Sequence, residues 1–348
     1  MAPAPARART CGMELRVLTA ADLDRVLTPG RALDAMRRAF GQLSGGRAEV
    51  PLRGAVESEH GTTLLMPACL RDSGELGVKV VSVFPANAGR GEPVVQGAVL
   101  LLDAESGRPR ALVDGTRLTA IRTAAGSALA TELLGDPAAD TLAIFGAGPQ
   151  GRAHAELFGS IRRLREIRIV SRSGVSARRL AAELRGLGER APWEDPPRIL
   201  AVSDPAAAVR HAGLVVTATT SREPVFRGAD LPAGAHVNAV GSYRPDMQEV
   251  DEATILRARV VVDQRAAAWD EAGDLIVPLK AGVVTRDVVD AELGEIVNGA
   301  APPGRRGHEI TLFESVGNAA QDVAMAGEAL AAAEREEIGT LVSFGARA

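Results

Sequence analysis

The sequence has few aromatic residues, few cysteines and no long apolar segment. Aromatic residues make up 3% of the chain and apolar residues 46%, so a core would be built mainly from Ala, Val and Leu. This composition is typical of a globular protein and not of a disordered one. The two cysteines, Cys11 and Cys69, lie far apart and provide neither a disulfide framework nor metal-ligand spacing. We therefore expect no metal site and a protein of the reducing cytoplasm.

Membrane-spanning segments and basic blocks are also missing. No apolar run approaches the roughly 20 residues that cross a bilayer. Residues 1–12 contain arginines without the apolar segment of a signal peptide, so we expect a disordered tail there. The 40 basic and 44 acidic residues give a formal net charge of −4. Without a basic patch this charge argues against a nucleic-acid partner.

The predicted elements fall into two parts, as expected for 348 residues, which exceed one ordinary core. Apolar residues recur every three or four positions over 29–43, which predicts a helix with one buried face. A strand-rich segment follows over 51–103, and an alanine-rich helix is predicted over 118–134. We interpret these residues as an α+β unit that precedes a second domain.

Strands and helices then alternate, which implies parallel pairing and right-handed crossovers. Six strands are expected to complete an open sheet: 141–145, 166–170, 198–202, 214–218, 236–241 and 259–263. Residues 311–341 are apolar and rich in alanine, with a predicted helix over 321–337. We expect this last part to return and pack on the first domain.

A glycine-rich turn lies between the first two strands of this series. Gly146-Ala147-Gly148-Pro149-Gln150-Gly151 matches G-x-G-x-x-G between a strand and a helix. Gly146 would allow the tight bend, Gly148 the approach of a pyrophosphate, and Gly151 close helix–strand packing. The phosphates would lie at the helix N-terminus, which favours anions. The context predicts dinucleotide binding, although a structural glycine turn is the alternative.

The second strand ends at Ser171-Arg172-Ser173, where NAD-binding sequences usually place an acidic residue for the ribose 2′-hydroxyl. The absence of a carboxylate and the presence of Arg172 favour a 2′-phosphate. We therefore expect NADPH as the cofactor, with NADH or NAD possible. In the alternative interpretation Arg172 is an ordinary solvated turn residue.

Three isolated cations stand in apolar surroundings: Arg53, Lys79 and Arg122. A buried lysine without a partner would cost several kcal/mol or become neutral. Together the three side chains would make a good carboxylate site, because guanidinium groups bind carboxylates bidentately. The alternative is that Lys79 faces solvent on an alternating strand, and spacing alone does not show that the three converge.

Several segments together resemble the ornithine cyclodeaminase/mu-crystallin family. They occur in the family's order and cover almost the whole chain: GVKVVSVFPAN, LTAIRTAAGSALA, IFGAGPQG, HVNAVGSYRPDMQEVD and TLFESVGNAAQDVA. The resemblance implies an α/β fold, in which a Rossmann doubly wound parallel sheet accompanies an α+β substrate and dimerisation domain formed by both chain ends. We expect residues 13–126 and 316–348 in the latter, residues 127–315 in the Rossmann domain, and a homodimer.

The resemblance also assigns site residues. Arg53, Lys79 and Arg122 fall on positions that bind the substrate's α-carboxylate. Pro149 and Gln150 fall on the pyrophosphate loop. Ser315 falls on a late cofactor contact near the nicotinamide. The remaining candidate cofactor contacts lie near the ends of later predicted strands: Thr217, Thr219 and Val240.

One departure from the family helps to choose an activity. Cyclodeaminases carry a catalytic aspartate where this chain has Tyr243, within GSYRPD. That segment looks like the mu-crystallin type, which reduces cyclic ketimines with NADPH. Asp246 lies three residues further on, and we do not transfer the aspartate's role to it.

We therefore predict an NAD(P)H-dependent oxidoreductase that transfers a hydride to the C=N carbon of a small α-imino carboxylate, such as pyrroline-2-carboxylate or piperideine-2-carboxylate. The alternatives are an ornithine or lysine cyclodeaminase with catalytic NAD, an alanine dehydrogenase and a non-enzymatic ligand-binding protein. Lys79 is the candidate for proton transfer, with water as the alternative source. The substrate's side chain and the physiological direction stay open.

Overall fold

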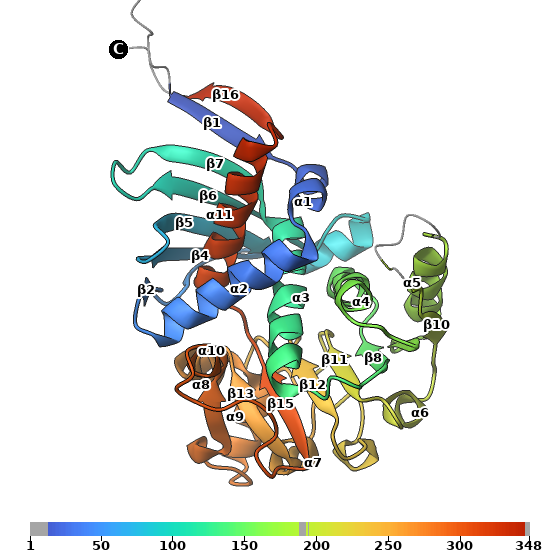
Figure 1. Ribbon diagram of the computed structural model, residues 1–348. Coiled ribbons are helices and arrows are strands. Elements are labelled where there is room, and N and C mark those ends of the chain that lie inside the picture. Colours follow the sequence, from blue (N-terminus) through green and yellow to red (C-terminus); the bar gives the residue numbers. More distant parts are fainter. Residues whose placement is uncertain (1–12, 188–192, 194, 345–348) are drawn as a thin grey trace, which may run out of the picture.

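The chain is organised around two eight-stranded sheets (Figure 1). The structure is a computed structural model that describes residues 13–187, 193 and 195–344. The tail expected at residues 1–12 lies outside the described residues. No helix of the described parts is both long and apolar enough to cross a membrane.

The first sheet is mixed and contains both ends of the described chain. Its order is β16-β1-β7-β6-β5-β4-β2, with β3 also paired to β4. The strands are β1 (Met13–Leu18), β2 (Ala48–Glu49), β3 (Gly54–Ser58), β4 (Gly61–Leu70), β5 (Glu75–Val83), β6 (Val95–Asp103), β7 (Pro109–Asp114) and β16 (Thr340–Phe344). The antiparallel pairing of β1 with β16 joins the two ends of the chain in one sheet.

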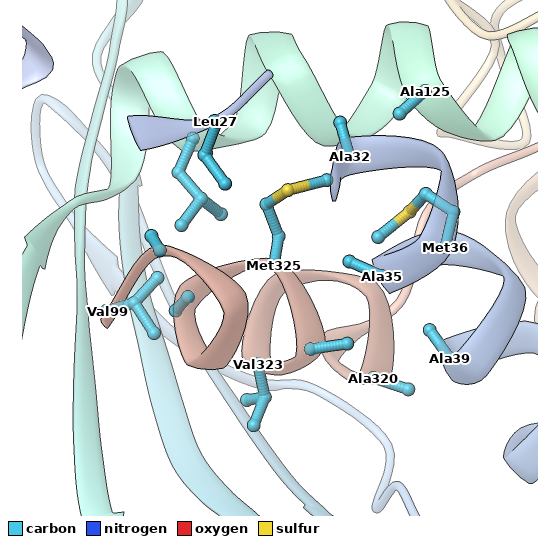
Figure 2. Close-up of a cluster of buried hydrophobic side chains, with 14 of the residues drawn as sticks. Leu27, Ala32, Ala35, Met36, Ala39, Val99, Ala125, Ala320, Val323 and Met325 are labelled. Atoms are coloured by element: carbon cyan, nitrogen blue, oxygen red, sulfur yellow. The ribbon is translucent and has the colours of Figure 1, made fainter. Parts of the chain in front are cut away.

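Helices α1 (Ala20–Val26), α2 (Pro29–Ser44), α3 (Gly115–Leu134) and α11 (Ala319–Arg335) accompany this sheet (Figure 1). Thr28 caps α2 and Pro29 occupies its first turn, which favours a helix start at that position. Met36 of α2 and Met325 of α11 belong to one buried cluster with many small side chains, and Met325 lies beside Ala32 (Figure 2). Alanines let these helices approach closely, which explains a core with few aromatic residues.

The second sheet is entirely parallel, in the order β10-β9-β8-β11-β12-β15-β13-β14. Its strands are β8 (Thr141–Phe145), β9 (Glu166–Val170), β10 (Arg198–Ala201), β11 (Leu214–Thr217), β12 (His236–Ala239), β13 (Ala258–Val262), β14 (Val289–Glu292) and β15 (Ile310–Glu314). The expectation that six strands complete this sheet is wrong. β15 lies between β12 and β13, because the chain returns to the sheet centre before entering α11.

Helices cover the parallel sheet, and α3 links the two halves of the molecule (Figure 1). The helices of this half are α4 (Pro149–Ile161), α5 (Val175–Arg185), α6 (Pro205–Val209), α7 (Glu252–Arg257), α8 (Arg265–Glu271), α9 (Gly273–Lys280) and α10 (Leu293–Val297). α3 is continuous and largely buried, with contacts to strands of both sheets. The predicted return of the chain end to the first half is confirmed, because α11 packs on β4, β5 and β6.

Candidate active site

The glycine loop between β8 and α4 has the geometry that its sequence predicts. Gly146 has a φ of +109°, and a side chain there would overlap the carbonyl oxygen of Ala218. A side chain at Gly151 would overlap the carbonyl of Gly146, whereas one at Gly148 would meet nothing within 4 Å. Gly146 and Gly151 therefore shape the turn, and the surface of Gly148 is open to a ligand.

A cleft of about 470 Å³ adjoins this loop. Its walls are the glycine loop and the residues that follow the carboxyl ends of β9, β10 and β11. β8 pairs with β9 on one side and β11 on the other, so the cleft lies where the strand order reverses, the usual ligand position in such sheets. No side chain of the described residues caps α4, whose N-terminal N–H groups suit a phosphate. The cleft fits a dinucleotide.

The predicted cofactor residues differ in how they relate to this cleft. Five of them line it: Gly146, Gly148, Ser171, Arg172 and Thr219. Ser173 follows as an exposed neighbour, and Pro149, Gln150 and Gly151 form the first turn of α4. Gln150 Nε2 lies 3.5 Å from the carbonyl oxygen of Thr119 on α3.

The other three predicted contacts lie deeper along the strand ends. The Thr217 hydroxyl is buried and donates to Glu249 at 2.8 Å. The Val240 N–H donates to the carbonyl of Thr217, and Ser315 Oγ donates to Asp263 at 2.9 Å. Thr217 therefore supports the loops around the cleft in this structure and does not line it.

Buried carboxylates hold those loops in place. Glu249 accepts from the backbone N–H of Thr219 at 2.6 Å and of Gly241 at 2.7 Å. Burial raises the pKa of Glu249, against these hydrogen bonds. The acidic run that begins at Glu249 has the composition of an exposed helix start, and Asp251 does cap α7. Glu249 itself is fully buried, because the chain folds it under the strand ends.

Lys79 on β5 is 3% exposed and points at α11, not at solvent. Its Nζ lies 2.5 Å from Asp322 Oδ2. Arg122 on α3 is also buried, and its Nε donates to Asp322 Oδ1 at 3.1 Å. One carboxylate thus joins two of the three predicted cations.

Arg53 approaches the same region from the segment before β3. Its Nη2 lies 2.5 Å from Glu271 Oε2 and donates to the carbonyl oxygen of Gly317 at 3.0 Å. Gly317 has a φ of +76°, and a side chain there would overlap the Arg122 guanidinium. The three cations therefore converge on the first turn of α11 and on the loop that precedes it, which also carries Ser315.

Electrostatics change the protonation of this cluster. Burial lowers the pKa of Lys79 to about 8, and Arg122 and Arg53 lower it too, while Asp322 opposes them. Burial raises the pKa of Glu271 to about 7, against the pull of Arg53. Both groups therefore titrate near neutral pH, where proton transfer is efficient.

Asp322 and Glu271 are absent from the residues that the sequence singles out. The signal for Asp322 was available, because it is an isolated charge in an apolar helix, as Arg122 is. Glu271 follows Asp270 at the end of a short helix, a pattern common on exposed surfaces. Its role in the cluster depends on where α8 packs, which the pattern does not contain.

Within residues 241–246, the segment that departs from the cyclodeaminase pattern, Tyr243 and Asp246 lie in different surroundings. Tyr243 is half-buried against the apolar cluster of the second sheet. Asp246 is exposed and forms ion pairs with Arg222 at 2.9 Å and Arg244 at 3.0 Å. In this structure the Asp246 carboxylate is therefore part of a surface ion-pair cluster.

Known proteins share both the sequence and this architecture. The family model described as ornithine cyclodeaminase/mu-crystallin family matches residues 13–333. A Delta(1)-pyrroline-2-carboxylate reductase of Bacillus cereus is 35% identical over 331 residues, 94% of this chain and 99% of the relative. The ketimine reductase mu-crystallin of Mus musculus is 33% identical over 296 residues, 84% of this chain and 88% of the relative.

A solved structure agrees with these matches. The Thermococcus litoralis Delta(1)-pyrroline-2-carboxylate reductase, in complex with NADH and L-proline, superposes with a TM-score of 0.86 at 35% identity. The match covers 94% of this chain and 99% of that one. The predicted α/β fold with a Rossmann sheet is confirmed, and the chain belongs to the ornithine cyclodeaminase/mu-crystallin family.

Proposed function

We infer that this protein reduces the C=N bond of a small α-imino carboxylate with NAD(P)H, and that a cyclic ketimine such as pyrroline-2-carboxylate is its substrate. The observation that carries this conclusion is the convergence of Arg53, Lys79 and Arg122 where the loop that holds Ser315 enters α11. Relatives that reduce such imines match nearly the whole chain. We place the protein in the cytoplasm, where its widely spaced cysteines would stay reduced.

The cluster suits a substrate carboxylate through its donors. Three carboxylates, Asp322, Glu271 and Asp263, already lie beside the three cations in a largely buried site. A substrate carboxylate would therefore be bound through the remaining N–H donors of the cations and not through an excess of positive charge. Arg53 and Arg122 would orient that carboxylate through paired N–H donors, and Lys79 would add a third contact.

A reduced nicotinamide bound in the cleft would supply the hydride. The protein's own contribution is to hold the substrate's C=N carbon toward the cleft and to manage the proton on nitrogen. Lys79, with a pKa of about 8, is charged at neutral pH and can give up a proton near its working pH. Proton transfer from Lys79 is part of the proposal, and water is the alternative donor.

The direct test is NADPH oxidation with pyrroline-2-carboxylate and piperideine-2-carboxylate, beside pyruvate with ammonia. We expect oxidation with the cyclic ketimines and little with pyruvate and ammonia. Ornithine and lysine with catalytic NAD should release negligible ammonia, because Tyr243 offers no carboxylate where cyclodeaminases have one. Proline or pipecolate formed from these amino acids without net cofactor reduction would favour the cyclodeaminase alternative.

Arg172 is proposed to select the phosphorylated cofactor, because it lines the cleft at the end of β9 where no acid is present. We expect tighter binding of NADPH than of NADH. Replacing Arg172 with alanine should narrow that gap by about 10- to 100-fold, since a charge-assisted contact contributes roughly 1.5–3 kcal/mol. Calorimetric titration of both cofactors provides the measurement. Equal affinities in the wild type would contradict the assignment.

We also propose a homodimer formed by the outer face of the first sheet. Helices cover the inner face, whereas Leu65, Val80 and Leu112 on the outer face are 42%, 38% and 38% exposed. Leu65 and Val80 are direct cross-strand neighbours, so the apolar side chains adjoin one another. An apolar patch of this kind is typical of an obligate interface.

Replacing Leu65 with glutamate tests the interface. A two-fold interface would bury the new charge twice, at several kcal/mol, so the dimer Kd should rise at least roughly 100-fold. Light scattering after size exclusion would then show a monomer. Glutamate at Leu256, which is 60% exposed on α7, is the matched control and should leave a dimer. A wild type that is monomeric at micromolar concentration would refute the proposal.

A further inference from the structure

Asp322 is the buried centre of the cation cluster. It lies in the first turn of α11 with no exposed surface, and its two oxygens contact different elements. Oδ2 lies 2.5 Å from Lys79 Nζ on β5, and Oδ1 accepts from Arg122 Nε on α3 at 3.1 Å. A strand and a helix that are separate in sequence are thereby tied to one carboxylate.

The backbone under Asp322 is fixed from several sides. The Asn318 side chain caps α11 by accepting from the N–H groups of Ala320 and Gln321. The neighbouring Gln321 accepts from Arg122 Nη1 at 2.8 Å, so two successive residues of the helix hold one guanidinium. A carboxylate in the first turn is also favoured by the helix dipole. Asp322 therefore has little freedom to move away from its partners.

The arrangement leaves part of Arg122 available. Asp322 and Gln321 engage Nε and Nη1, while Nη2 makes no hydrogen bond within the described part of the chain. The Lys79 ammonium has three donors, and Asp322 lies beside one face of it. Each cation thus keeps donors for a second, incoming carboxylate.

We propose that Asp322 is a positioning residue that holds the Lys79 ammonium and the Arg122 guanidinium in one fixed arrangement for the substrate carboxylate. This inference rests on the proposed function, since it assigns how the same site is kept ready. Burial and the two arginines lower the pKa of Lys79, and Asp322 raises it. Without Asp322, Lys79 should therefore lose its proton at a lower pH than in the wild type. Its role is exerted through its partners and not by contact with the reacting atoms.

The small number of lysines makes the charge of Lys79 directly measurable. The whole sequence contains two lysines, Lys79 and Lys280. Protein labelled with ¹³C at lysine Cε should give two signals whose chemical shifts report the charge of each ammonium. Lys280 is exposed at the end of α9 and serves as an internal reference. Neither substrate nor turnover is needed for this measurement.

In the wild type we expect Lys79 to titrate near pH 8. In Asp322→Asn the Lys79 midpoint should fall to about pH 7 or lower, because the opposing charge is removed. Glu328→Gln is the matched control, because it also removes a carboxylate from α11, one that pairs with Arg38 on α2 and not with Lys79. An unchanged Lys79 midpoint in Asp322→Asn would overturn the proposal.

Kinetics provide the second readout. At pH 7 Asp322→Asn should raise KM for the cyclic ketimine at least roughly tenfold, and the alkaline limb of kcat/KM should move to lower pH with the Lys79 signal. Asp322→Glu should restore the position of that limb because it restores the charge, but its longer side chain should keep KM raised. A lower KM in Asp322→Asn would show that the carboxylate only offsets charge, and would refute a positioning role.

If Asp322→Asn does not fold, Asp322→Glu is decisive. A Lys79 midpoint near the wild-type value with a raised KM supports the proposal, and an unchanged KM contradicts it. A wild type that reduces no imine, with the expected Lys79 shift still present, would refute the proposed function but not the electrostatic pairing.

Discussion

Replacing Lys79 with methionine is expected to lower kcat/KM for a cyclic ketimine by roughly 30- to 4,000-fold. Removing one member of a buried charged contact typically costs about 2–5 kcal/mol, and each 1.4 kcal/mol is tenfold. The fold should persist, because methionine has a similar length and Asp322 keeps its contact with Arg122. Arg122→Ala should lower kcat/KM over a similar range, through the loss of the guanidinium.

Lys280→Met is the control, since it removes the other lysine of the chain from an exposed position. Steady-state kinetics with saturating NADPH give the comparison, and circular dichroism checks the fold. Near-normal turnover of a carboxylated imine by Lys79→Met would show that the carboxylate site is assigned wrongly.

Gly146→Val is expected to abolish measurable cofactor binding and to destabilise the protein without ligand. Its φ of +109° is strained for a β-branched residue, and the side chain would overlap the Ala218 carbonyl. Backbone strain of this kind costs roughly 1–3 kcal/mol before the overlap is counted, so Tm should fall by about 5 °C or more.

Gly148→Ala distinguishes the stability of the glycine loop from its affinity for the cofactor. An added methyl at Gly148 meets no protein atom within 4 Å, so Tm without cofactor should stay near the wild-type value. Cofactor affinity should fall, because the methyl occupies the surface that a pyrophosphate would approach. Unaltered NADPH affinity in both variants would contradict the placement of the dinucleotide.

Local patterns predicted the elements whose signals are dense in sequence. Residues 29–43 match α2 within one residue, because its cap, its proline and its apolar stripe all agree. The glycine loop follows a buried strand and precedes a helix, as its motif requires. β15 was not predicted, since its short apolar run adjoins α11 and its place between β12 and β13 is set by topology.

The sequence predicted the cations of the site but not the carboxylates that pair with them. Arg53, Lys79 and Arg122 could be identified because a cation in an apolar context is unusual. Their mutual approach depends on the return of the chain end, which brings Asp322 between β5 and α3. No spacing rule links residues about 200 or more positions apart. The carboxylate partners could therefore be identified from the packing of the structure but not from the sequence.

Hydride transfer from the reduced nicotinamide to the imine carbon of a cyclic α-imino carboxylate can be followed by isotope labelling. The experiment is mass spectrometry of the product formed from pyrroline-2-carboxylate and NADPH deuterated at both C4 positions. We expect proline that carries a single deuterium at C2, with one cofactor oxidised per molecule formed. Proline without deuterium, or no proline from an enzyme that binds NADPH, would contradict the proposed hydride transfer.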